Sequence, residues 1–321
     1  MRDALVALCP PAETLEQQLN ASFAAQRPSA VKKRRWRLAI DLHWRPDSGQ
    51  AQQRVEELYR SRAKHGTTRF HAYATCYLVH HGRRDTVALT GVEKGTALVE
   101  VLKRLLRCAR HTGVRPKRLL LDRGFYSVPV IRSLQAARYP FIMPAIIRGR
   151  QAAHPKGPSG TRVFALWKRS GWSSDPLTRA HQRKATVRIA VHGRHRRGQC
   201  RRQGRQTLVY AFWGIAPKTT QWVFHIDRHR FGIETRYRPL GEACIKTTTR
   251  NPTLQLLFVD IALLLRTVWV WVLWVYLATP RRGGRQLNWH SLRFKTLLMW
   301  LTHLAEETFG TDDTVVAAQV P

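Results

Sequence analysis

Two short apolar runs, each closed by an acid, mark the centre of the predicted fold. Asp41 ends the first run in RLAIDLHW, and Asp122 ends the second in RLLLDRGF. Continuous apolar segments of this length are typical of buried strands. Alternating or continuous runs predict strands over residues 36–43, 70–80, 85–91, 117–122 and 141–144. Helical spacing of apolar positions predicts helices over residues 12–25, 96–112, 127–137 and 289–306.

The order of these elements predicts the fold class. Three strands, of which two are joined as a hairpin, are followed by helix, strand, helix and strand. Antiparallel hairpins followed by βαβ crossovers describe an α/β protein with a mixed sheet flanked by helices.

The composition changes after residue 148. Residues 148–206 are rich in Arg, Gly and His, and we interpret them as an inserted β-rich subdomain. Its predicted strands cover residues 162–168, 185–192 and 207–215. The next segment, Asp227–Lys246, predicts a helix that carries Glu234 among several arginines.

A long apolar helix begins at Asn251-Pro252, which read as its N-cap and first residue. Its length suggests a membrane span, but Asp260 and Arg266 would then lie inside the bilayer, at about 2.5–3.5 kcal/mol each. The uninterrupted apolar remainder, 268–278, is too short to span. We therefore expect a core helix and no membrane partner. We also expect no signal peptide, because Asp3 and Pro10 interrupt the start of the sequence.

Charge narrows the function. The 321 residues contain 55 Lys and Arg against 20 Asp and Glu, a formal charge of +35. This excess is spread along the chain, which favours a polyanionic partner, with nucleic acid as the first expectation. The 5 cysteines form no C-x-x-C pair, which argues against a disulfide framework or a zinc ribbon.

The acids suggest a metal site. Asp41 and Asp122 are expected on neighbouring strands, and Glu234 on a helix packed against the sheet. Carboxylate oxygens are the ligands that Mg²⁺ prefers, and two such ions roughly 4 Å apart can activate water and stabilise both oxygens of a phosphodiester cleavage. Nearby arginines would hold the phosphates.

The same stretches carry a family resemblance. LAIDLH, LLLDRGFYS and RFGIETRYR resemble the three acidic motifs of DDE transposases of bacterial and archaeal insertion sequences, in the insertion-sequence-four group and its relatives. That group carries a Tyr-x-x-Arg-x-x-x-Glu-x(6)-Lys signature. Arg230 and Glu234 match it, whereas Asp227 stands at the Tyr position and Gly241 at the Lys position.

The resemblance implies a ribonuclease-H-like core with a β-rich insertion before the last catalytic helix. It implies Asp41, Asp122 and Glu234 as catalytic residues and metal ligands, with two Mg²⁺ ions that Mn²⁺ can replace. The expected partners are double-stranded transposon-end and target DNA and a second copy of the chain in a synaptic homodimer, in the cytoplasm on the nucleoid. The candidate DNA-binding residues are Arg123, Arg230, Arg236, Arg238 and Lys246.

The predicted organisation has five parts. They are a short N-terminal segment (1–35), the first part of the core (36–147), the basic insertion (148–220), the rest of the core (221–280) and a C-terminal helix and tail (281–321). Two alternatives to a transposase remain. Asp227, Gly241 and the short N-terminal segment also fit a catalytically decayed copy that only binds DNA, and the apolar helix leaves a basic membrane-associated protein as the third reading.

Overall fold

The fold comes from a computed structural model that describes residues 2–26, 34–47, 59–64, 66–80, 83–177, 185–196, 204–231, 243, 249, 251–282 and 284–310. The helices are α1 (Arg2–Leu8), α2 (Ala12–Ala25), α3 (Leu98–His111), the 3₁₀ turn η3 (Arg123–Phe125), α4 (Val128–Ala136), α5 (Arg162–Ala165), α6 (Thr220–Phe231), α8 (Pro252–Val275) and α9 (Phe294–Phe309). The strands are β1 (Arg35–Pro46), β2 (Tyr59–Lys64), β3 (Thr67–His80), β4 (Arg83–Val92), β5 (Arg115–Leu121), β6 (Phe141–Pro144), β7 (Gly171–Leu177), β8 (Ala185–Arg196), β9 (Gly204–Trp213), β10 (Thr279–Arg281) and β11 (Gly284–Gln286).

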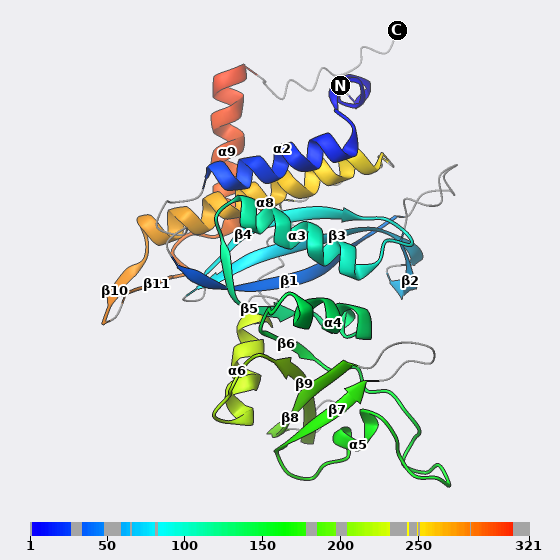
Figure 1. The fold of residues 1–321 in the computed structure, drawn as a ribbon. Coiled ribbons are helices and arrows are strands. Elements are labelled where there is room, and N and C mark those ends of the chain that lie inside the picture. The colour runs from blue at the N-terminus through cyan, green and yellow to red at the C-terminus, as the bar shows by residue number, and fades with distance from the viewer. Residues whose placement is uncertain are drawn as a thin grey trace.

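One mixed sheet organises the described chain (Figure 1). Its strand order is β2-β3-β1-β5-β6-β9-β8-β7, and β4 also pairs with β3. The β1, β3 and β4 strands are antiparallel neighbours, whereas β1, β5 and β6 are parallel. Helix α3 lies in the connection to β5, and helix α4 joins β5 to β6. Parallel strands need such crossover connections, whereas antiparallel strands can be joined by a short hairpin. The predicted α/β class, a mixed sheet flanked by helices, is confirmed, and its strand order is consistent with the expected ribonuclease-H-like fold.

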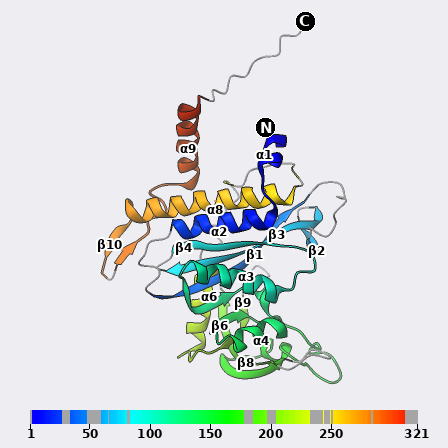
Figure 2. The ribbon, with the colours of Figure 1, turned by 45° about the horizontal axis from the view of Figure 1, so that its top comes forward.

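Alternation along β1 divides the core into two layers. Leu38 and Ile40 pack with α3 and α4 on one face, and Ala39 packs with α2, α6 and α8 on the other. Side chains alternate between faces with a period of two residues, so a strand buried on both sides reads as a continuous apolar run. Figure 2 shows α2 and α8 side by side across the second face, which we call the α8 face.

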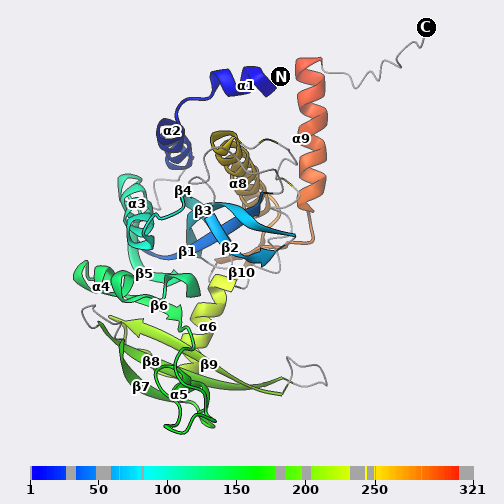
Figure 3. The same ribbon diagram turned by 90° about the vertical axis from the view of Figure 1, so that its right-hand side faces the viewer.

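The strands of the basic insertion continue this sheet. β9 pairs antiparallel with β6, and β8 and β7 follow (Figure 3). The strand predicted over 162–168 is wrong: residues Arg162–Ala165 form α5, and the third strand is β7. Phe164 and Trp167 are three residues apart and pack edge to face at 5.6 Å between ring centroids, which is helical rather than alternating spacing.

The predicted elements of the core are largely confirmed. α2 and β6 have the predicted bounds, while β1 continues to Pro46, beyond the predicted end at residue 43. Pairing with β3 carries β1 further, because Pro46 still aligns with Phe70. The helix predicted to start at Asp227 begins at Thr220, and the part of that prediction beyond Phe231 lies outside the described residues.

The long helix α8 lies on the sheet and begins at the predicted cap. The Asn251 side chain accepts hydrogen bonds from the backbone N–H groups of Thr253 and Leu254, at 2.9 and 3.2 Å. α8 is long and apolar enough to cross a membrane by length and composition, with half of that apolar stretch buried inside the protein. It packs against α2, β3 and β4, and both Asp260 and Arg266 are buried.

Helix α2 covers the outer edge of β4. Among the described strands, β4 pairs only with β3, so its outer backbone groups need other partners. The Asn20 side chain supplies two of them, donating to the Leu89 carbonyl at 2.8 Å and accepting from its N–H at 2.9 Å. A Glu16 carboxylate oxygen accepts from the Gly91 N–H at 3.0 Å. Helix α2 thus supplies side-chain partners for backbone groups of Leu89 and Gly91 in β4.

Replacing Asn20 with Leu should lower the free energy of unfolding by about 2–4 kcal/mol, because both Leu89 backbone groups lose their partner. Urea denaturation measures the change. Gln17→Leu, an exposed position on the same helix, is the matched control and should change stability little. An equal effect at both positions would contradict the role of Asn20.

Asp260 makes stability depend on pH. Both of its carboxylate oxygens lack a hydrogen-bond partner, and burial raises the pKa of its carboxyl group to about 7. Because its unfolded pKa is about 3.9, the unfolded chain releases the proton first. Stability is therefore lost as the pH rises from about 4 to 7.

We expect Asp260→Asn to remove this loss. The gain in unfolding free energy over the natural chain should be about 2 kcal/mol larger at pH 8 than at pH 5. Urea denaturation at the two pH values measures this difference. An equal gain at both pH values would show that burial does not raise the pKa of the Asp260 carboxyl group.

Candidate functional site

The parallel pairing of β1 with β5 brings two of the predicted acids together. Ile40 aligns with Leu121 in this register, and the next residue of each strand is Asp41 and Asp122. The Asp122 N–H donates to the Ile40 carbonyl at 3.2 Å, so the pairing extends to the acid itself. Neighbouring strands lie about 4.8 Å apart, which makes the two aspartates neighbours.

Asp41 and Asp122 are partly exposed because β5 ends beside them. The apolar residues of both runs before the acids, 38–40 and 119–121, are fully buried, whereas Asp41 and Asp122 are partly exposed. After Asp122 the chain turns into η3, closed by a 3.0 Å hydrogen bond from the Phe125 N–H to the Asp122 carbonyl. β1 continues past Asp41 beside β3 alone. The acid therefore lies at an edge although its own strand does not end there, which corrects the expectation of a strand end.

Gly124 keeps the turn close to β1. A Cβ atom there would lie 3.3 Å from Cδ1 of Leu42 and 3.8 Å from a carboxylate oxygen of Asp122. The absence of a side chain thus allows the turn after Asp122 to pack against the strand that carries Asp41.

A buried polar cluster lies beside Asp41. Thr75 of β3 aligns with Asp41, and its hydroxyl lies 2.8 Å from Nε2 of His43. The same nitrogen lies 3.1 Å from the Tyr77 hydroxyl, and the Arg266 guanidinium lies 5.9 Å from the centre of the Tyr77 ring. Thr75 and Tyr77 are fully buried. These residues were not predicted as part of the site. The signal was the two-residue spacing of Asp41 and His43, which puts both side chains on one face of β1.

Helix α6 leads toward the third predicted acid. Val223 and Phe224 pack on the α8 face of the sheet with Ala39 and Leu120, the residues two positions before Asp41 and Asp122. The described part of this helix ends at Phe231. Glu234, Arg236, Arg238 and Lys246 lie outside the described residues, as does the side chain of Arg230.

Asp227 and Arg123 are described. Asp227 is only 1% exposed, on the buried side of α6, and one of its carboxylate oxygens has no hydrogen-bond partner. Arg123 directly follows Asp122 and is exposed. It is the one predicted DNA-binding side chain whose place the structure describes, and it lies next to an acid of the site.

The donor set fits a hard divalent cation. Asp41 and Asp122 offer carboxylate oxygens at a partly exposed edge, and Oδ1 of Asp41 already accepts from the Leu42 N–H at 3.1 Å. Mg²⁺ takes oxygen ligands and keeps several waters, so two or three carboxylates suffice. Within the described ranges there is no group of three His, Cys, Asp or Glu side chains that could hold a metal.

The described chain is thus an α/β protein with a mixed sheet and two neighbouring aspartates where its central parallel strands separate. No family model and no curated protein matches the sequence. Among solved structures it is similar to piggyBac transposase, in a cryo-EM structure of the synaptic complex with hairpin DNA. The two are 13% identical, with a TM-score of 0.46 over 87% of this chain and 55% of that one. The chain therefore spans about half the length of that protein.

The contact between Thr75 and His43 can be isolated by a double-mutant cycle. Thr75→Val keeps the shape of the side chain and removes its hydroxyl, which should lower the unfolding free energy by about 1 kcal/mol. In a His43→Ala background the same change should have little effect, because the partner is already absent. Equal losses in both backgrounds would show that the two side chains are not coupled.

Proposed function

We propose that the protein is a DDE-type transposase that cleaves transposon-end DNA and joins it to target DNA in a metal-dependent reaction. The observation that carries the proposal is the register of β1 and β5, which makes Asp41 and Asp122 neighbours. They are the first two acids of the proposed set, and Glu234 is the third.

The chain's own residues have distinct tasks in this proposal. Asp41 and Asp122 hold metal from adjacent strands, and Glu234 holds it from the segment that follows α6. The packing of α6 on the α8 face supports this role for Glu234, because alternation along β1 directs Asp41 to the same face. Two Mg²⁺ ions, or Mn²⁺ in their place, would supply an activated hydroxyl and neutralise charge on the attacking and leaving oxygens.

Arginines next to these acids are proposed to hold the scissile strand. Arg123 is exposed beside Asp122, and its planar guanidinium suits two oxygens of one phosphate. Arg230, Arg236, Arg238 and Lys246 are proposed for the same task near Glu234. The formal charge of +35 supports binding of double-stranded DNA on the nucleoid, with a strong dependence on salt. A homodimer that holds two transposon ends is part of the proposal.

Removing each acid separately tests the reaction. Asp41→Asn, Asp122→Asn and Glu234→Gln should each lower Mg²⁺-dependent nicking of DNA that carries the element's ends by more than about 100-fold, because each loses a metal ligand. Binding of the same DNA should be retained. Nicking with Mg²⁺ or Mn²⁺ on a labelled end fragment measures the first, and a mobility shift the second.

Glu93→Gln is the matched control, since Glu93 is exposed in the loop before α3 and far in sequence from all three acids. Full activity in any one of the three variants would remove that residue from the set. Salt-sensitive binding by the natural chain with no cleavage under either metal would instead support a decayed copy that only binds DNA.

A further inference from the structure

The opposite end of the central strands carries a different chemistry. Arg35 of β1 aligns with Arg115 of β5 at the amino ends of the two strands, where Lys117 and Arg118 follow. Asp122 lies seven residues further along β5, which corresponds to about 23 Å at 3.3 Å per residue. Cations and acids therefore mark opposite ends of one strand pair.

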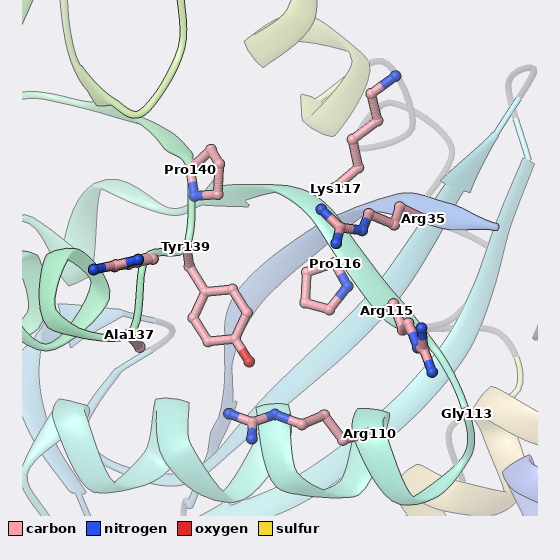
Figure 4. Close-up of a pocket in the computed structure, with 10 residues that line it drawn as sticks. Arg35, Arg110, Gly113, Arg115, Pro116, Lys117, Ala137, Tyr139 and Pro140 are labelled. Atoms are coloured by element: carbon pink, nitrogen blue, oxygen red, sulfur yellow. The ribbon is translucent and has the colours of Figure 1, made fainter.

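A cationic hollow lies at this end (Figure 4). Its volume is about 730 Å³, and its lining contains five cations and no acid. In Figure 4 the Arg110 side chain reaches from α3 toward Tyr139, and its guanidinium carbon lies 5.7 Å from the centre of the tyrosine ring. The five cations are Arg35, Arg110, Arg115, Lys117 and Arg138.

Two further hollows continue the first one on either side. One, of about 480 Å³, shares Arg110 and Tyr139 with it and extends to Lys103 and Arg107. The other, of about 400 Å³, shares Arg35 and Lys117 and extends toward α6. We call the three together the cationic groove. Its extent suits a polymer of phosphates, because a single small anion needs only one or two of these side chains.

The positive charge of the central hollow is not neutralised within the described chain, whereas Lys103 of the second hollow pairs with Glu100 at 2.8 Å. None of the five cations of the central hollow forms an ion pair with an acid among the residues that the structure describes. Beside them, Arg37 and Arg118 are aligned on adjacent strands. Burial and the charge of Arg37 both lower the pKa of Arg118, and its buried Nε has no hydrogen-bond partner. These two aligned guanidinium groups add positive charge beside the central hollow.

Arg138 adds an independent observation. It follows α4 in the left-handed region, at φ 54°, and it is the one residue other than glycine with positive φ among the described residues. The Tyr139 N–H donates to the Leu134 carbonyl at 2.9 Å and the Arg138 N–H to the Gln135 carbonyl at 3.0 Å, which is the helix ending that usually contains glycine here. An unfavourable backbone conformation that places an arginine at a hollow points to a functional constraint.

We propose that the cationic groove is a second DNA-binding surface, which holds the phosphate backbone at the edge of the sheet opposite the acids. A concave row of cations fits the ridge of a nucleic-acid backbone, whereas an anionic membrane presents a flat surface. The phosphates held by Arg35 and Arg115 are not those beside Asp41 and Asp122, given the distance along β5. The surface would anchor DNA whether or not the acids cleave it, so this inference does not depend on the proposed catalysis.

Salt dependence of binding tests the groove. In the triple variant Arg115→Gln, Lys117→Gln, Arg138→Gln, affinity for duplex DNA should fall, and the slope of log K against log salt should become shallower by about 2–3, since each lost phosphate contact contributes about 0.9. The matched control removes the same charge from exposed segments on either side of α5, as Lys156→Gln, Lys168→Gln, Arg169→Gln. It should leave the slope near its natural value. An unchanged slope in the groove variant, or an equal change in both, would overturn the proposal.

Arg138→Gly separates binding from folding. Glycine relieves the left-handed backbone, so the melting temperature should rise by roughly 2 °C, while DNA affinity should fall several-fold. Opposite signs in the two measurements exclude a general loss of structure as the cause. Affinity equal to that of the natural chain would overturn the assignment of Arg138.

The same titrations distinguish this proposal from the proposed function. Asp41→Asn should keep the natural salt slope, because it leaves the groove intact. A shallower slope in the groove variant together with no cleavage by the natural chain would retain the groove and reject the transposase. Cleavage by the natural chain together with an unchanged slope in the groove variant would retain the transposase and reject the groove.

Discussion

The structure depends on the pairing of the parallel strands β1 and β5, which separate after Ile40 and Leu121. β1 and β5 run together from Arg35 and Arg115 to Ile40 and Leu121, and then β5 turns away while β1 continues along β3. Both strands bury side chains on the two faces of the sheet, and the packing of these side chains fixes the register of the pair. A shift of one residue would turn Asp41 toward the α3 side of the sheet. The core therefore determines where the acids lie.

Strong local patterns made much of this fold predictable. The apolar runs before Asp41 and Asp122 gave the central strands, and the Asn251-Pro252 pair gave the start of α8, because these signals are local and agree with the packing. The strand predicted over 162–168 failed because aromatic side chains three residues apart were interpreted as a strand although they suit one helical turn. β2 escaped prediction since its polar sequence pairs only at the end of a long β3.

Two of the three predicted acids lie in the described part of the chain, and Glu234, outside it, stays a prediction. Asp41 and Asp122 were identified because each closes an apolar run, and the structure brings them together. The spacing of Asp41 and His43 shows that they share a face of β1, but the contacts of His43 with Thr75 and Tyr77 depend on the register between β1 and β3, which no local pattern reveals. The cationic groove was hidden in a similar way. Its arginines come from β1, α3, β5 and the end of α4, and in the sequence they are indistinguishable from the rest of a chain with 55 basic residues.

Helix α2, which bonds the outer edge of β4, also affects the order in which the chain can fold. Asn20 and its partner Leu89 are 69 residues apart, and α2 packs against α8, which begins only at Pro252. During synthesis, the apolar side of α2 therefore emerges long before the surfaces that bury it. Contacts so distant in sequence slow folding and leave intermediates open to association. Helix α2 is synthesised long before α8, so its apolar side stays uncovered by that partner until Pro252–Val275 has been made.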